Sequence, residues 1–145
     1  MIEDYLKITA LIAQYTRAVD SADFEELGRL FAYGEVTTNR EGAELKGSES
    51  IARYWRDVNK SYGDAGLATH HMVTNLEFGD LKADAVDVRS YFLVLQATPG
   101  FPLAPIVAGR YVDRFARRGD DWHFAKKHIE VSLVGDISHH LNIVI

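Results

Sequence analysis

The side chains in this sequence that are best suited to proton transfer are its six histidines and one of its aspartates, Asp20. Histidine exchanges protons near neutral pH, and a neighbouring carboxylate can orient its ring for general acid–base catalysis. His70 and His71 are adjacent near the start of a predicted strand, so their side chains point to opposite faces of a sheet. One of the two must face the interior, and the pattern alone does not decide which.

Asp20 lies at the end of an apolar helical pattern, directly after Val19. A carboxylate at a helix C-terminus meets the unfavourable end of the helix dipole, so solvent or a basic partner must compensate it. It is not needed as a cap for the next helix, because Asp23 stands in the better position for that. Two interpretations remain open: a solvated link between two helices, or a functional acid.

Several other chemistries find no support in the sequence. The chain has no cysteine, which excludes a catalytic thiolate, a disulfide framework and a thiolate metal site. Adjacent histidines on a strand cannot chelate one ion, and no acid stands at ligand spacing to His71. His139 and His140, near the C-terminus, could bind a metal only adventitiously. The glycines form no phosphate-binding or dinucleotide fingerprint, so we expect neither a metal nor a cofactor.

Three helices are predicted to carry or surround these residues. Apolar residues recur at helical spacing from Tyr5 to Val19. A second helix follows, with Asp23 as its N-cap and Glu26 completing a capping box, and it ends at Tyr33–Gly34. A third begins after a short strand, at 35–39, and a turn, at 40–42, and takes Ser48 as its N-cap.

From residue 69 onward the pattern is that of β-strands. We expect four long antiparallel strands, at 69–78, 85–97, 106–117 and 122–134, with a loop at 99–105. This order predicts an α+β fold and not a doubly wound sheet. Three helices cover one face of a bent sheet. The other face, around Tyr91, Leu93 and Leu95, is apolar enough to predict a homo-oligomer, either dimer or trimer.

Length and charge further limit the domain organisation and the partners that the sequence predicts. At 145 residues, with 47% hydrophobic residues, the chain is expected to form a single domain over 1–145. Its net charge of −5 argues against nucleic-acid binding, which requires neutralisation of phosphates. The sequence shows neither a signal-peptide pattern nor an apolar stretch long enough to span a membrane, which predicts a cytoplasmic protein that does not bind membranes.

Five segments together resemble SnoaL-like proteins of the nuclear transport factor two-like superfamily. Each is modest alone, but they occur in the expected order over nearly the whole chain. The segments are 15–31, with Val19-Asp20 and Asp23-Phe24, then 47–51, 69–75, 109–115 and 122–124.

The resemblance implies a cone-shaped barrel, in which a strongly bent antiparallel sheet is wrapped by three helices around an internal pocket. It also implies that Asp20 and His71 form the His–Asp pair found in the dehydratases and dehydrochlorinase of this superfamily, so that His71 faces inward. Such a pair abstracts a proton from carbon without a cofactor. The implied activity is that of a lyase or isomerase acting on a small hydrophobic, aromatic or polycyclic molecule.

The resemblance further suggests pocket roles for Tyr15, Tyr54, Trp55, Arg110 and His128. For the first three, packing in the core is the competing interpretation. For Arg110 and His128, the alternation of side chains along a strand does not decide whether they face the pocket or the outside of the sheet.

The sequence also departs from scytalone dehydratase, a member of the superfamily. Gln96 falls where that enzyme has a second pocket histidine, and Asn39 and Val19 fall at its tyrosines. Scytalone itself is therefore not the expected substrate. Two other roles remain open on this fold: a non-catalytic binding protein for small molecules, and the small subunit of a ring-hydroxylating dioxygenase.

Overall fold

The computed structural model describes residues 1–40 and 44–145. Within these ranges the chain forms three α-helices, a short 3-10 helix and one six-stranded sheet. The turn predicted at 40–42 lies largely outside the described residues. In chain order the elements are α1 (Ile2–Asp20), α2 (Phe24–Leu30), β1 (Glu35–Thr38), β2 (Leu45–Lys46), α3 (Gly47–Val58), the 3-10 turn (Gly63–Ala65), β3 (Thr69–Phe78), β4 (Ala85–Thr98), β5 (Phe101–Arg118) and β6 (Asp121–Val134).

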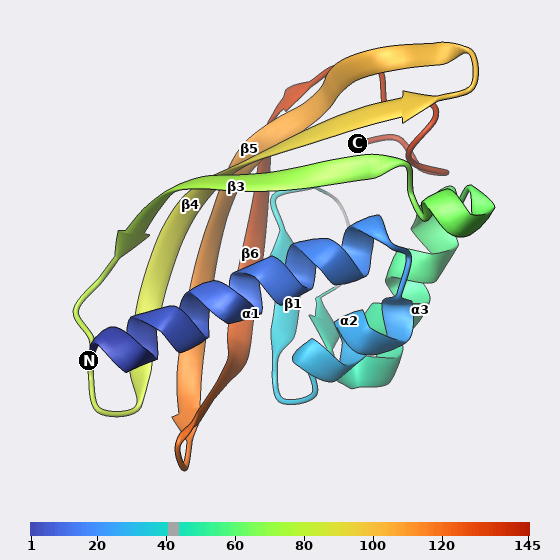
Figure 1. Cartoon of the computed structure of the whole chain (residues 1–145). Coiled ribbons are helices and arrows are strands. Elements are labelled where there is room, and N and C mark those ends of the chain that lie inside the picture. The colour runs from blue at the N-terminus through green and yellow to red at the C-terminus, as the bar shows by residue number, and fades with distance from the viewer. Residues whose placement is uncertain (41–43) are drawn as a thin grey trace.

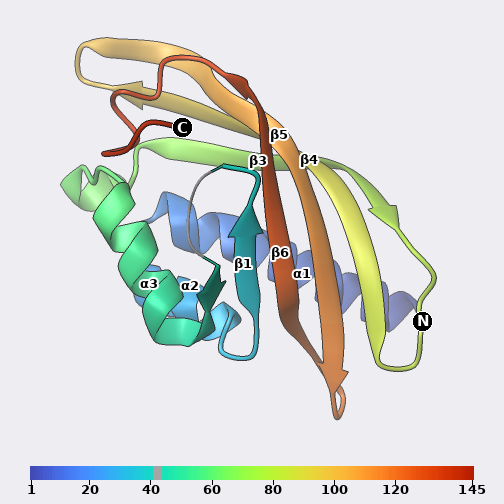
Figure 2. The ribbon, with the colours of Figure 1, turned by 180° about the vertical axis from the view of Figure 1, so that it is seen from behind.

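The strands form a single curved sheet in the order β2-β1-β6-β5-β4-β3. The four long strands are antiparallel neighbours, as predicted, whereas β1 pairs with β6 in parallel. Figures 1 and 2 show the long strands bending over α1, with α2 and α3 gathered at one end. Register shifts interrupt all three long pairings, and such bulges bend strands locally. The α+β cone expected from the sequence is therefore confirmed.

The helices cover the concave face of the sheet. α1 turns its predicted apolar stripe, which includes Ile8, Ile12 and Tyr15, toward that face. Asp23 caps α2 as predicted, by accepting a hydrogen bond from the Glu26 backbone N–H at 3.1 Å. The Glu26 carboxylate does not complete the capping box, because it binds Arg29 instead. No helix in the described ranges has the length and hydrophobicity needed to cross a bilayer.

Three predictions about element boundaries are wrong. α2 ends at Leu30, with Phe31 as its C-cap, and not at Tyr33–Gly34. The segment 99–105 is not a loop, because β5 begins at Phe101 and pairs with Thr98 of β4 across a tight turn. The prolines are tolerated there because the ladder is irregular at this end, with register shifts on both sides of Leu95–Gln96. α3 begins one residue before Ser48, with Lys46 in the cap position and no side-chain cap.

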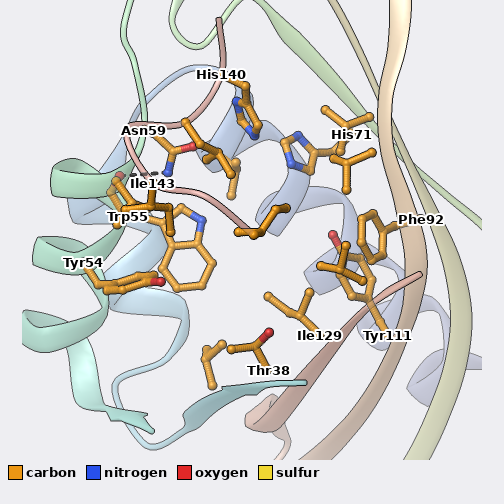
Figure 3. Close-up of a pocket in the computed structure, with 18 of the residues that line it drawn as sticks. Thr38, Tyr54, Trp55, Asn59, His71, Phe92, Tyr111, Ile129, His140 and Ile143 are labelled. Atoms are coloured by element: carbon orange, nitrogen blue, oxygen red, sulfur yellow. Dashed lines mark hydrogen bonds between the residues drawn. The ribbon is translucent and has the colours of Figure 1, made fainter. Parts of the chain in front are cut away.

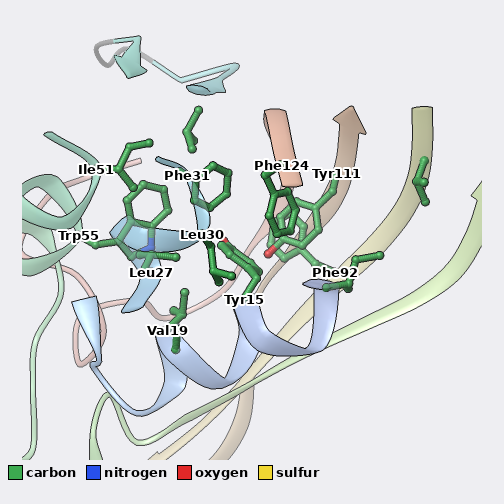
Figure 4. Packing of buried hydrophobic residues seen from close by; sticks show 14 of the residues in the cluster. Tyr15, Val19, Leu27, Leu30, Phe31, Ile51, Trp55, Phe92, Tyr111 and Phe124 are labelled. Atoms are coloured by element: carbon green, nitrogen blue, oxygen red, sulfur yellow. The ribbon is translucent and has the colours of Figure 1, made fainter. Parts of the chain in front are cut away.

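The core between α1 and the sheet is aromatic and contains a buried ion pair. Figure 4 shows Tyr15 of α1 among the rings of Phe31, Phe124 and Tyr111. Lys127, from β6, is only 1% exposed. Its ammonium lies 3.5 Å from the centre of the Tyr111 ring and 3.1 Å from the carboxylate of Asp113. The sequence pattern gave no sign of this pair, because strand alternation does not exclude a charged residue from an interior position.

Candidate active site

A cavity of about 150 Å³ lies between the concave face of the sheet and the helices. The long strands form one wall, α1 and α3 form the others, and the C-terminal segment after β6 closes the top (Figure 3). Its lining is mainly apolar. The polar or aromatic residues among those that line it are Tyr15, Thr37, Thr38, Tyr54, Trp55, Asn59, His71, Phe92, Tyr111 and His140.

His71 and Asp20 lie within hydrogen-bonding distance at one side of this cavity. Nδ1 of His71 is 2.5 Å from Oδ1 of Asp20. The backbone N–H of His71 donates to Oδ2 at 2.9 Å, and the hydroxyl of Thr69 donates to Oδ1 at 2.8 Å. The His71 side chain lines the cavity, while Asp20 lies behind it and does not. The carboxylate thus receives three donors from the start of β3.

The chain brings these residues together at the junction of α1 and β3. Asp20 is the last residue of α1, and its carbonyl accepts a hydrogen bond from the Leu67 backbone N–H at 2.9 Å. The loop can approach this closely only because residue 66 is glycine. A Cβ there would lie 2.2 Å from the Asp20 carbonyl oxygen, and its φ of +62° disfavours other residues. β3 then begins at Thr69, and alternation directs Thr69 and His71 to the same face.

Electrostatics keep Asp20 ionised. Burial acts to raise its pKa, but the hydrogen bond and charge of His71, the His71 backbone N–H and the Thr69 hydroxyl outweigh burial, and the pKa is lowered overall. An ionised carboxylate only accepts hydrogen bonds, so Nδ1 of His71 must carry the proton. In the neutral ring Nε2 is then the acceptor, and it is the nitrogen left for the cavity. This arrangement suits a general base.

The other predicted pocket residues divide into two groups. Tyr15, Tyr54 and Trp55 line the cavity. Arg110 and His128 lie on the convex face of the sheet, away from the cavity. The guanidinium of Arg110 lies over the ring of Tyr91. Nδ1 of His128 lies 2.8 Å from the Thr37 hydroxyl oxygen. His128 is also the cross-strand partner of Val112, which is exposed.

Thr69 and His140 are among the groups of the site that sequence reasoning missed. Thr69 could have been found, since it shares a strand face with His71. His140 could not, because it follows the last strand in a segment without periodic pattern, and only the turn of the chain at Gly135–His140 returns it to the cavity. Its neighbour His139 points elsewhere, against the Phe101 ring. Gln96 is buried beside this segment, where its amide donates to the carbonyls of Leu67 and His139.

The described residues hold no cluster of three or more His, Asp or Glu side chains arranged to bind a metal ion. The imidazole and carboxylate at the cavity are bonded to each other and form a dyad. The chemistry available to this chain's own side chains is therefore proton transfer in an apolar enclosure.

Solved structures with the same fold are numerous. LinA is 21% identical, with a TM-score of 0.74, over 99% of this chain and 94% of that one. A protein from Novosphingobium aromaticivorans assigned as a scytalone dehydratase is 19% identical, with a TM-score of 0.73, over 93% and 88%. A second protein from the same organism, assigned as an aromatic ring hydroxylase, is 20% identical, with a TM-score of 0.76, over 96% and 97%. At these identities the likeness concerns the fold.

No curated protein matches the sequence. The SnoaL-like domain, in contrast, matches residues 1–128, which include both members of the dyad, all three helices and the long strands up to the middle of β6. The resemblance noted in the sequence is thereby confirmed, and the chain belongs to the SnoaL-like family.

Proposed function

We propose that this protein is a cofactor-independent lyase or isomerase that abstracts a proton from a carbon atom of a small, largely apolar molecule. The observation that carries the proposal is the 2.5 Å bond between Asp20 and His71 at the wall of an apolar cavity. An apolar cavity of about 150 Å³ accommodates a molecule the size of benzene. The volume thus favours a single six-membered ring over the polycyclic ligands that the family resemblance also allowed.

The reaction begins when Nε2 of His71 takes a proton from carbon, and the charge of Asp20 stabilises the resulting imidazolium. In an elimination, the electron pair left on carbon forms a double bond as a hydroxyl on the neighbouring carbon departs. The imidazolium returns its proton to that hydroxyl, which leaves as water, and His71 is neutral again. In an isomerisation the same proton returns to a different carbon. General acid–base catalysis of this kind typically contributes about 10²–10⁴-fold in rate.

The first step can be tested without the natural substrate. Cyclohexanone fits the expected size and has acidic α-hydrogens, so its exchange with solvent deuterium can be followed by proton NMR. 3-Hydroxycyclohexanone tests elimination, because its product, cyclohex-2-enone, absorbs in the ultraviolet. We expect protein-dependent exchange that His71→Ala removes. The control is His70→Ala, which changes the adjacent histidine on the opposite, exposed face. Full activity in the His71 variant would sink the proposal, as would exchange with neither ketone.

Asp20→Asn tests the role of the carboxylate. The amide has the same shape, but its NH₂ can face Nδ1 and favour the wrong tautomer of His71, with the proton on Nε2. We expect the exchange rate to fall by about 10²–10⁴-fold while the fold, followed by circular dichroism, is retained. An Asn variant with the wild-type rate would show that the carboxylate is not needed.

A binding protein without catalysis is the second candidate. The observation that favours it is that Asp20 also fastens α1 to β3, through Thr69 and the His71 backbone. On this alternative the dyad is structural, so both His71→Ala and Asp20→Asn should lower the unfolding free energy and no bound ketone should exchange. The likeness to a protein assigned as an aromatic ring hydroxylase leaves a subunit role as a third candidate. Co-purification of a larger partner would favour it.

A further inference from the structure

A second histidine, His140, faces the cavity from the C-terminal segment. Its residue is 5% exposed, and its ring lies 6.1 Å from the ring of His71, at 60° (Figure 3). Nδ1 of His140 is buried and has no hydrogen-bond partner among the residues that the structure describes. Buried polar groups are almost always paired, so an unpaired one at a cavity wall calls for an explanation. Residue 140 also lies outside the segment that matches the SnoaL-like domain.

The backbone holds this ring in place. The His140 carbonyl accepts a hydrogen bond from the Lys60 N–H at 2.8 Å, and the Asn142 N–H donates to Val58 at 2.8 Å. Leu141 forms a β-bridge with Asn59. The segment is therefore fastened to the end of α3 and the residues just after it at His140, Leu141 and Asn142, and the ring is presented to the cavity in a fixed position.

Burial keeps His140 neutral. The pKa of His140 is lowered to about 4, with burial as the largest cause; the charge of His71 acts in the same direction, and the carboxylate of Asp20 opposes both. At neutral pH the ring is thus uncharged, with one N–H donor and one acceptor nitrogen. A neutral imidazole can still polarise a carbonyl by hydrogen bonding.

We propose that His140 binds an oxygen of the ligand, donating a hydrogen bond to the carbonyl next to the carbon from which His71 takes a proton. The two rings are neighbours at the same end of the cavity, with their centres 6.1 Å apart, so a ligand that reaches His71 also has His140 beside it. Negative charge that develops on this oxygen during proton abstraction is then stabilised by the His140 N–H. This inference rests on the proposed function and specifies its substrate class: a small cyclic ketone or a related carbonyl compound.

A pair of isosteric ligands tests the contact by binding alone. Cyclohexanone carries the carbonyl, and methylenecyclohexane has the same shape without the oxygen. We expect wild-type protein to prefer the ketone and His140→Phe to bind it about 3- to 10-fold more weakly, as expected for one lost hydrogen bond, with affinity for the hydrocarbon little changed. Affinities can be measured by ligand-observed NMR, with His140→Leu as a second variant should the phenylalanine disturb folding.

His139→Phe is the matched control, since His139 is adjacent in sequence but does not line the cavity. It should leave the preference for the ketone unchanged. The inference is overturned if wild-type protein shows no preference for the ketone or if His140→Phe retains it. The proposed function fails by a different result. If His140→Phe loses the preference for the ketone but His71→Ala still catalyses hydrogen exchange, the contact between His140 and the ligand oxygen stands and the proposed catalysis by His71 does not.

Discussion

At the scale of single residues, His71 and His140 show how environment divides one residue type into two roles. His71 is bonded to an ionised carboxylate that fixes its tautomer. His140 has no such partner among the described residues and is kept neutral chiefly by burial. The charge of His71 acts with burial to lower the pKa of His140, while the carboxylate of Asp20 opposes both. The cavity thus combines a base with a neutral hydrogen-bonding group.

The depressed pKa of His140 predicts a pH dependence of stability. Between its ordinary value of 6.5 and its folded value of about 4, the unfolded chain binds a proton that the folded protein does not. Stability is therefore fully present above pH 6.5 and falls as the pH drops toward 4, by about 3 kcal/mol over that range. Urea unfolding of wild-type protein and His140→Phe from pH 7 to 4.5 measures this loss.

The unfolding free energy of His140→Phe should fall less between pH 7 and 4.5 than that of wild-type protein. His123, whose pKa is also lowered mainly by burial, is present in both proteins and cancels in the difference. Parallel curves for the two proteins would contradict the prediction.

At the scale of elements, the site depends on how closely the loop before β3 approaches the end of α1. Gly66→Ala would place a Cβ against the Asp20 carbonyl and would force alanine into a backbone conformation with φ +62° and ψ −124°. We expect a loss of unfolding free energy together with a lower proton-exchange rate, because Asp20 must move away from His71.

Gly63→Ala is the matched control for this substitution. Gly63 also has positive φ, at +58°, but nothing lies within 4 Å of a Cβ built there. It should cost only about 1–2 kcal/mol, from backbone strain, without any effect on exchange. Equal effects of the two substitutions would show that the close contact with Asp20 is unimportant.

The cross-strand pair of Lys127 and Asp113 supports the aromatic floor of the cavity from within the core. Burial raises the pKa of Asp113, and burial likewise lowers that of Lys127, while each partner's charge opposes the change. Lys127→Met leaves a buried carboxyl group without its partner and should cost about 3–5 kcal/mol in urea unfolding. The double variant Lys127→Met/Asp113→Leu should recover most of this loss. A double variant no more stable than the single one would argue that the charges themselves are needed.

At the scale of the whole molecule, none of the described helices covers the convex face of the sheet, which exposes Met72, Tyr91 and Val112. Charges of both signs, including Arg110 and Glu130, lie among these apolar side chains. In a dimer with a two-fold axis, each charge can therefore pair with an opposite charge on the second copy. We expect a homo-oligomer built through this face.

Sedimentation at micromolar concentration tests this expectation. Tyr91→Glu should shift the protein toward monomer, because it places a charge at the centre of the apolar face. Leu6→Glu, at an exposed position on α1, should not. A wild-type monomer at this concentration would rule the interface out.

The sequence by itself determined the α+β class and the order of the α-helices and of the strands other than β2, because local periodicity is a property of neighbouring residues. The candidate pair Asp20–His71 came from the resemblance to a family, since the residue pattern alone left both residues open. The sequence pattern misplaced the start of β5, where pairing with β4 overrides the prolines. Only the tertiary structure decided what surrounds the dyad, since those contacts join residues far apart in the chain. His140 enters the cavity through the fold of the C-terminal segment, and Lys127 is buried through the pairing of β6 with β5. Arg110 and His128 turn outward because the bulges in the ladder set the alternation of each strand.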